Sequence, residues 1–160
     1  MVIHDILPVC IGPCPPSWIA NADHCYHIVK NIKPIPRDGA SKICKRDSAT
    51  LASITSENEQ HFLEKYRDDQ GFEHNDMWIG GQKKDGTWKW DDGSSFSYEN
   101  WADGQEPTFG SCNILLTSDR YNKIDNKWYA ISCTNSHYSL VACKKIRKIP
   151  LIGNSNGKNS

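Results

Sequence analysis

The sequence of 160 residues predicts one α+β domain in which helices precede a series of short strands. After an early hairpin, helical spacing of apolar residues continues to about Gly71, and short strand patterns separated by turns then run to Cys143. This length suits one ordinary domain and is too short for two comfortable ones. Six tryptophans and a charged fraction of 24% argue against a disordered chain.

The first elements are a strand or hairpin and a short helix. Residues 17–29 are strand-like, and proline-containing turns bound them on both sides. Residues 37–46 predict a helix, because Ala40, Ile43 and Cys44 share one face at the spacing i, i+3, i+4. We expect this face to pack in the hydrophobic core rather than to contact a cofactor.

A second helix is expected to begin near Ser56 and to end by Gly71. Ser-Glu-Asn-Glu at 56–59 is a capping box, in which the Ser56 hydroxyl accepts the N–H three residues on and Glu59 reaches back to the cap. The apolar stripe of this helix consists of Phe62, Leu63 and Tyr66. These residues too are expected to be core.

Short strands follow, separated by Asp-Gly turns and by one long irregular stretch from about Asn100 to Ser111. The expected strands cover residues 77–79, 88–90, 96–98, 112–116, 127–133 and 138–143. No internal repeat is present. The tail after Cys143 is basic and ends in Asn, Gly and Ser, so we expect residues 144–160 to be disordered. A basic patch for heparin-like chains or anionic lipid is the alternative.

Charge and motifs exclude several classes of function. Lysine and arginine total 19, as do aspartate and glutamate, so no net charge favours nucleic acid as a partner. No stretch approaches the roughly 20 apolar residues of a membrane span, which argues against membrane insertion. No nucleophile elbow, zinc-protease motif or phosphate loop occurs, so an enzyme is not expected. Adjacent acids such as Asp91 and Asp92 are expected to be turn formers and solvated charges.

The seven cysteines favour disulfides over a metal site. They stand at Cys10, Cys14, Cys25, Cys44, Cys112, Cys133 and Cys143. No Cys-x-x-Cys pair occurs, so the close ligand pairs of a structural zinc site are missing. Three bridges with one cysteine left over fit better, and the sequence alone allows many pairings.

Four segments in the second half of the chain form a distinctive series. These are Trp-Ile-Gly-Gly at 78–81, Trp-Lys-Trp-Asp-Asp-Gly at 88–93, Tyr-Glu-Asn-Trp at 98–101 and Glu-Pro at 106–107. The upstream residues Ala40, Cys44, Leu51, Ser53, Ile54, Glu59, Gln60 and Phe62 match the same pattern. Over residues 14–143 the chain thus resembles the C-type lectin-like domain family, with residues 1–13 as an N-terminal segment. The resemblance implies two helices, a twisted, mostly antiparallel sheet and a long irregular loop region.

The resemblance also implies the disulfide pairing. Cys44 would pair with Cys143, Cys112 with Cys133, and Cys14 with Cys25 in the N-terminal hairpin of the long-form domains. Such bridges require an oxidising compartment, so we expect a secreted protein or an extracellular ectodomain. Cys10 then remains as a terminal thiol, as a thiol paired outside this chain, or as the site of an interchain disulfide that links a dimer.

The family's calcium site looks degraded. Such lectins hold a calcium ion with a Glu-Pro-Asn or Gln-Pro-Asp triplet, a Glu two residues before the next Cys, and an Asn-Asp pair after a Trp. Here the triplet is Glu-Pro-Thr at 106–108, Gly110 precedes Cys112, and Tyr129 and Ala130 follow Trp128. No metal or other cofactor is therefore expected at the usual place.

Two further positions bear on calcium. Lys83 occupies the place where family members with a second calcium carry an acid. Asp103 and Asp119 are the residues that could build a site elsewhere.

The resemblance implies carbohydrate binding through the long loop, and the alternative is calcium-independent binding of an extracellular protein. The candidate ligand-binding residues are Glu106, Pro107, Thr108, Phe109 and Tyr129. We expect Trp101 and Trp128 to be core, and Phe109 and Tyr129 to be exposed contacts. Pro107 is expected to be cis, as is usual at this family position. A purely structural role, such as matrix assembly through Cys10, is the third option.

Overall fold

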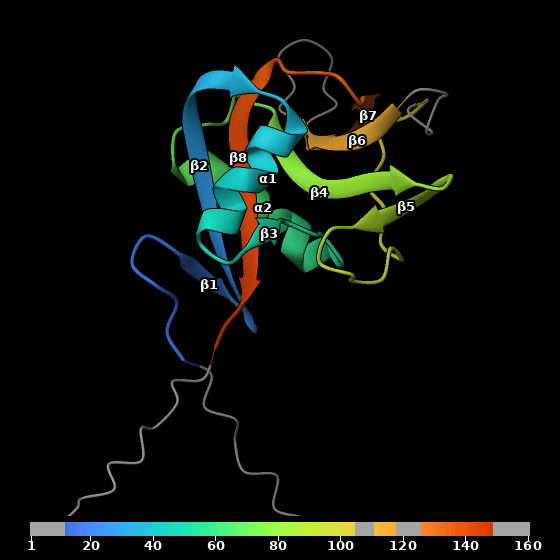
Figure 1. Ribbon diagram of the computed structural model, residues 1–160. Helices are drawn as coiled ribbons and strands as arrows, with labels where there is room; N and C mark the ends of the chain where they lie inside the picture. The colour runs from blue at the N-terminus through green and yellow to red at the C-terminus, as the bar shows by residue number, and fades with distance from the viewer. Residues whose placement is uncertain (1–11, 105–110, 118–125, 149–160) are drawn as a thin grey trace, which may run out of the picture.

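The computed structural model describes residues 12–104, 111–117 and 126–148 (Figure 1). The described helices are α1 (Arg37–Arg46) and α2 (Glu57–Asp69). The strands are β1 (Ile19–Asn21), β2 (His24–Ile35), β3 (Thr50–Leu51), β4 (Met77–Lys84), β5 (Thr87–Trp90), β6 (Ser111–Leu116), β7 (Trp128–Ser132) and β8 (Tyr138–Ile146). The predicted α+β class is therefore confirmed.

One mixed sheet joins all of these strands in the order β1-β2-β8-β4-β6-β7. Strand β3 is attached to β8, and β5 is attached to β4. The paired strands run antiparallel except for β4 and β8, which are parallel through Met77–Leu140 and Trp78–Val141. The sheet is thus mostly antiparallel, as expected, and β8, the last of the described strands, lies in its centre.

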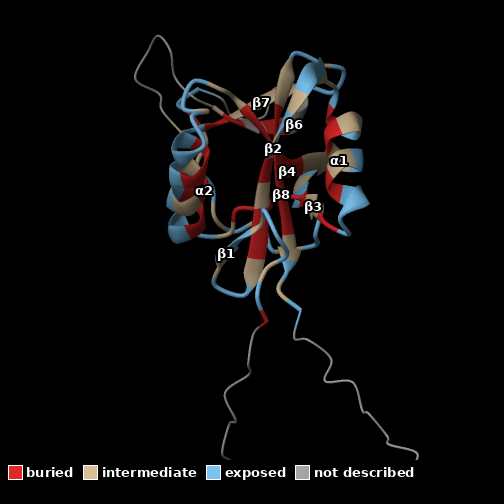
Figure 2. Ribbon diagram, turned by 90° about the vertical axis from the view of Figure 1, so that its left-hand side faces the viewer, coloured by how far each residue is buried: buried red, intermediate tan, exposed pale blue. Residues whose placement is uncertain are grey.

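The two helices cover opposite faces of the sheet. Figure 2 shows α2 on one side and α1 on the other, with the buried faces of both turned towards the strands. On the α2 side, Leu63 and Tyr66 pack into the larger core cluster with Trp128. On the α1 side, Ala40 and Cys44 pack against Trp78. The expected apolar faces of both helices are therefore buried.

The Gly-Gly pair that follows Ile79 allows neighbouring segments to come close to β4. A Cβ atom at Gly80 would lie 2.4 Å from the backbone oxygen of Leu51, and a Cβ at Gly81 would lie 2.2 Å from Cδ1 of Ile114. At Gly80 only glycine fits, because the neighbouring atom belongs to the backbone, whereas a Cβ at Gly81 would require the Ile114 side chain to move. The backbone N–H of Gly80 uses the close approach to donate to Ala52 O at 2.8 Å.

Three sequence expectations about the strands need correction. No strand forms at residues 96–98, where Phe96 instead stacks on Trp90 with ring centroids 4.8 Å apart. Strand β2 continues past residue 29 to Ile35, and Pro34 lies within the register irregularity between Lys30 and Ile35. Strand β8 runs to Ile146, so the first residues assigned to the tail belong to the sheet.

The disulfides agree with the pairing that the family implies. Cys14 is bonded to Cys25, and Cys44 is bonded to Cys143. Cys133 is also disulfide-bonded, while the side chain of its expected partner Cys112 and the whole of Cys10 lie outside the described residues.

Neither described helix is long and apolar enough to cross a membrane.

Candidate functional site

Part of the expected ligand-binding face lies on β7. Tyr129 is half-buried there and pairs with Leu115 of β6. It lies next to the fully buried Trp128, so the two side chains point to opposite faces of the sheet. Glu106, Pro107, Thr108 and Phe109 lie outside the described residues, as do Asp119 and the expected cis bond.

An aromatic cluster holds the segment that leads into the long loop. Trp128 contacts four rings edge-on, and their centroids lie between 5.3 and 6.0 Å from its own. These rings belong to Trp90, Phe96, Tyr98 and Trp101. A backbone bridge also joins Trp101 to Trp128. Trp128 is core, as expected, and Trp101 is only partly buried against the same cluster.

Polar side chains from α2 connect this cluster to the far end of the loop region. Gln60 accepts a hydrogen bond from Trp128 Nε1 at 2.9 Å and donates to Asn126 O at 2.8 Å. Asn100 donates to the same carbonyl at 2.8 Å. Arg67, which is 2% exposed, donates to Asn126 Oδ1 at 2.5 Å. The far end of the loop region is therefore fixed on α2, and the near end is bonded to the far end through Asn100.

The described part of the family's calcium site does not fit calcium. Tyr129 and Ala130 offer no carboxylate or amide oxygen where the family places an Asn-Asp pair. Calcium needs six to eight oxygen ligands, several of them charged. No group of three or more metal-ligating side chains occurs among residues 12–104, 111–117 and 126–148. Asp103 is exposed at the edge of the loop region.

A buried ion pair ties α2 to β8 on the other side of the cluster. The Lys144 ammonium is bonded to a Glu59 carboxylate oxygen, and their side chains are 3% and 7% exposed. Glu59 also accepts from the Tyr26 hydroxyl and, at 2.7 Å, from the backbone N–H of Thr55. Burial raises the pKa of Tyr26, and its bond to Glu59 raises that pKa further.

This geometry corrects two expectations. Ser56 caps α2 as predicted, because its hydroxyl accepts from the N–H of Glu59 at 3.2 Å. The Glu59 carboxylate, however, bonds to Thr55 and to the core groups. Lys144, which was expected to begin a disordered tail, is fully enclosed in the core.

The acid pair that follows β5 is also built into the structure. Asp91 accepts from Arg37 Nη2 at 2.6 Å, and both side chains are largely buried. Asp92 accepts from Ser53 Oγ at 2.5 Å and from the backbone N–H of Ser94 at 2.9 Å. Desolvation pushes the pKa of Asp92 up, but the hydrogen bonds from Ser53 and Ser94 outweigh it and hold that pKa below 3.8. These acids are therefore more than solvated turn formers.

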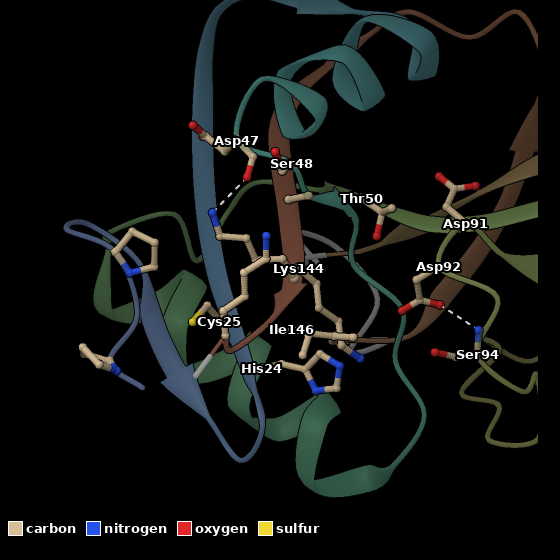
Figure 3. A pocket seen from close by; sticks show the side chains of 15 residues that line it. His24, Cys25, Asp47, Ser48, Thr50, Asp91, Asp92, Ser94, Lys144 and Ile146 are labelled. Atoms are coloured by element: carbon tan, nitrogen blue, oxygen red, sulfur yellow. Dashed lines mark hydrogen bonds between the residues drawn. The ribbon is translucent and has the colours of Figure 1, made fainter. Parts of the chain in front are cut away.

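Asp91 and Asp92 face a surface pocket of about 730 Å³. Its walls come from the α1–β3 turn, the end of β8, the start of β2 and the Asp91–Ser94 turn (Figure 3). Figure 1 shows the end of β8 and the start of β2 at the bottom of the molecule, with β6 and β7 near the top. The pocket is thus remote from Tyr129, and no sequence motif predicted it, although three of its lysines belong to the basic segment after Cys143.

The mixed sheet, with one helix on each face, is the arrangement that the resemblance to C-type lectin-like domains implies. Residues 33–145 match the family described as the lectin C-type domain. Because this match covers more than half of the chain, the protein belongs to the C-type lectin domain family.

Two similar proteins that are named as lectins agree with this membership. The chain is 31% identical to ladderlectin of Oncorhynchus mykiss over 138 residues, which are 83% of this chain and 69% of ladderlectin. It is 33% identical to the galactose-specific lectin nattectin of Thalassophryne nattereri over 94 residues, which are 58% of each chain.

Among solved structures, the chain is similar to a calcium-independent type II antifreeze protein. The two are 25% identical with a TM-score of 0.69, over 84% of this chain and 95% of that chain. The same domain architecture is therefore found in lectins and in an antifreeze protein.

Proposed function

We propose that this protein is an extracellular glycan-binding module. We further propose that it binds its ligand with no calcium ion at the position where the family usually holds one. The observation that carries the proposal is the pair Tyr129 and Ala130 on β7, which replaces two oxygen ligands by an aromatic ring and a methyl group. An aromatic face stacks on the C–H face of a sugar and needs no metal to do so.

Other observations support the two parts of this proposal. Nattectin is named as galactose-specific and the antifreeze protein as calcium-independent, so related domains carry each property. The disulfides Cys14–Cys25 and Cys44–Cys143 persist in oxidising compartments, which supports an extracellular location. Glu106 and Thr108 carry oxygens that can accept hydrogen bonds from sugar hydroxyls.

The test is a glycan array probed with the full chain in calcium and again in chelator. We expect the same glycans to bind in both conditions, with no shift in melting temperature between them. Binding that disappears in chelator and returns with calcium would contradict the proposal.

Variants then locate the binding face. Tyr129→Ala should weaken binding by about tenfold, the value of one aromatic contact, whereas Tyr129→Phe keeps the ring and should bind normally. Glu106→Ala should also weaken binding. Thr87→Ala, at an exposed position on β5, is the matched control.

A protein ligand on the same face is the second candidate, because Tyr129 and Ile131 lie on one face of β7 as partly buried apolar side chains. An array without any bound glycan, together with a pull-down from extracellular extract that Tyr129→Ala abolishes, would favour this candidate.

A further inference from the structure

The pocket at the end of β8 has the chemistry of a second ligand site. Its volume of about 730 Å³ lies within the roughly 300–1,000 Å³ typical of small-molecule sites. Figure 3 shows charged, hydroxyl and apolar side chains from separate elements converging on it. None of its lining residues belongs to the Tyr129 face.

The charges that line the pocket are balanced. Three lysines, at 144, 145 and 148, and three aspartates, at 47, 91 and 92, contribute to its lining. Lys144 and Asp91 are already neutralised by Glu59 and Arg37. The pocket therefore does not select a ligand of either net charge, but it offers both donors and acceptors. Sugar hydroxyls, which donate and accept at once, match this combination.

Asp92 is the acceptor that is best prepared for such a ligand. One carboxylate oxygen accepts from Ser53 and the other from Ser94, so the group is held in one orientation. The Ser94 side chain also bonds to this carboxylate, and the acceptor position that then remains can take a hydrogen bond from a sugar hydroxyl. Hydrogen bonds to an ionised acceptor are roughly twice as strong as neutral ones.

Donors and an apolar surface lie on the other walls. Lys145 Nζ donates to Asp47 O at 2.9 Å and lies 4.2 Å from the Trp18 ring centroid, which leaves further N–H groups available. Lys148 makes no hydrogen bond or ion pair with the described part of the chain. Ile146, which is 70% exposed, supplies an apolar face of the kind that packs on sugar C–H groups.

We propose that this pocket binds a neutral saccharide unit, held by Asp92 and Lys148 and packed against Ile146. This pocket is distinct from the long loop. The proposal does not depend on whether the surface around Tyr129 binds glycan.

The experiment is an NMR titration of the ¹⁵N-labelled full chain. The probes are methyl α-mannoside, methyl β-galactoside, N-acetylglucosamine and methyl α-glucoside, with glucose 6-sulfate as the anionic comparison. We expect at least one neutral probe to move the amide signals of Thr50, Asp92 and Ser94. This response should persist in Tyr129→Ala.

Two variants test the pocket itself. Thr50→Tyr places a ring in the pocket from β3 and should weaken the response by about tenfold or more. Thr87→Tyr makes the same change at an exposed position on β5 and should leave the response unchanged. Lys148→Ala, at an exposed residue outside the secondary structure, should weaken binding several-fold without affecting folding.

Three results would overturn the proposal. The first is that no probe moves the pocket amides. The second is that only the amides near Tyr129 and Trp101 respond, which would leave the proposed glycan-binding function intact. The third is that glucose 6-sulfate alone moves the pocket amides, which would mean that the pocket selects anions.

Discussion

Replacing either Glu59 or Lys144 alone is expected to destabilise the protein strongly, whereas replacing both should cost less than the sum of the two single changes. The two side chains form an ion pair that is almost fully enclosed between α2 and β8. Removing one partner leaves the other as an uncompensated buried charge. We consider Glu59→Leu, Lys144→Met and the double variant.

The contacts set the order of these effects. Losing one partner of a buried pair lowers the free energy of unfolding by about 3–5 kcal/mol. Glu59→Leu should lie at the upper end, because it also strands the Tyr26 hydroxyl and the N–H of Thr55. Lys144→Met should lie at the lower end, because Glu59 keeps those donors. The double variant should recover about 1–3 kcal/mol of the summed loss.

The assay is urea unfolding with the disulfides intact, read as a double-mutant cycle at constant m-value. Lys65→Met is the control, since Lys65 pairs with Asp69 at 2.5 Å but the two side chains are 74% and 57% exposed. That change should cost at most about 1 kcal/mol. If Lys144→Met costs no more than the control, or if the two core changes simply add, the account of the buried pair is wrong.

Three further changes test other parts of the structure. Gly80→Ala should lower the free energy of unfolding by about 1–3 kcal/mol or more, because its Cβ would press on the backbone oxygen of Leu51 2.4 Å away. Urea unfolding measures this loss, and an unchanged midpoint would refute the close approach. Replacing Cys44 and Cys143 by Ala should lower the free energy of unfolding by about 4–5 kcal/mol, because the bonded residues are 99 positions apart. This loss should exceed the loss on replacing Cys14 and Cys25, and the melting temperatures of the two double variants test the order. Because the pKa of Asp92 is lowered on folding, its ionised form stabilises the protein above pH 3.8, and this stabilisation is lost as the pH falls through the lowered pKa. Melts across pH 2–7 should therefore show the wild type and Asp92→Asn converging in acid, and parallel curves would contradict the assignment.

Local signals in the sequence predicted most of the secondary structure. The helix over 37–46 follows from the spacing of its apolar residues, and the structure has the same bounds. Ser56 caps α2 because a hydroxyl at this position can reach an N–H three residues on, which is a purely local geometry. The disulfides Cys14–Cys25 and Cys44–Cys143 came from the family resemblance rather than from the spacing itself.

Some local signals have more than one structural outcome. The alternation of Phe96 and Tyr98 is typical of a strand, but irregular backbone also places every second ring on a core. Here both rings pack around Trp128, and the segment pairs with no strand among the described residues. The alternating pattern therefore predicted the wrong backbone, although both rings are partly buried against the core.

The sequence by itself determined the class of domain, its two helices and the loss of carboxylates beside Trp128, because these depend on neighbouring residues or on a recognisable motif. Only the tertiary structure decided that Lys144 belongs to the core and that Asp92 faces a pocket. The Lys144 ammonium can be buried because distant segments supply its partners. Glu59 lies 85 positions before it in the sequence, and Ser53 lies 91 positions before it. Neither burial nor partner is encoded in the residues that adjoin a charged side chain.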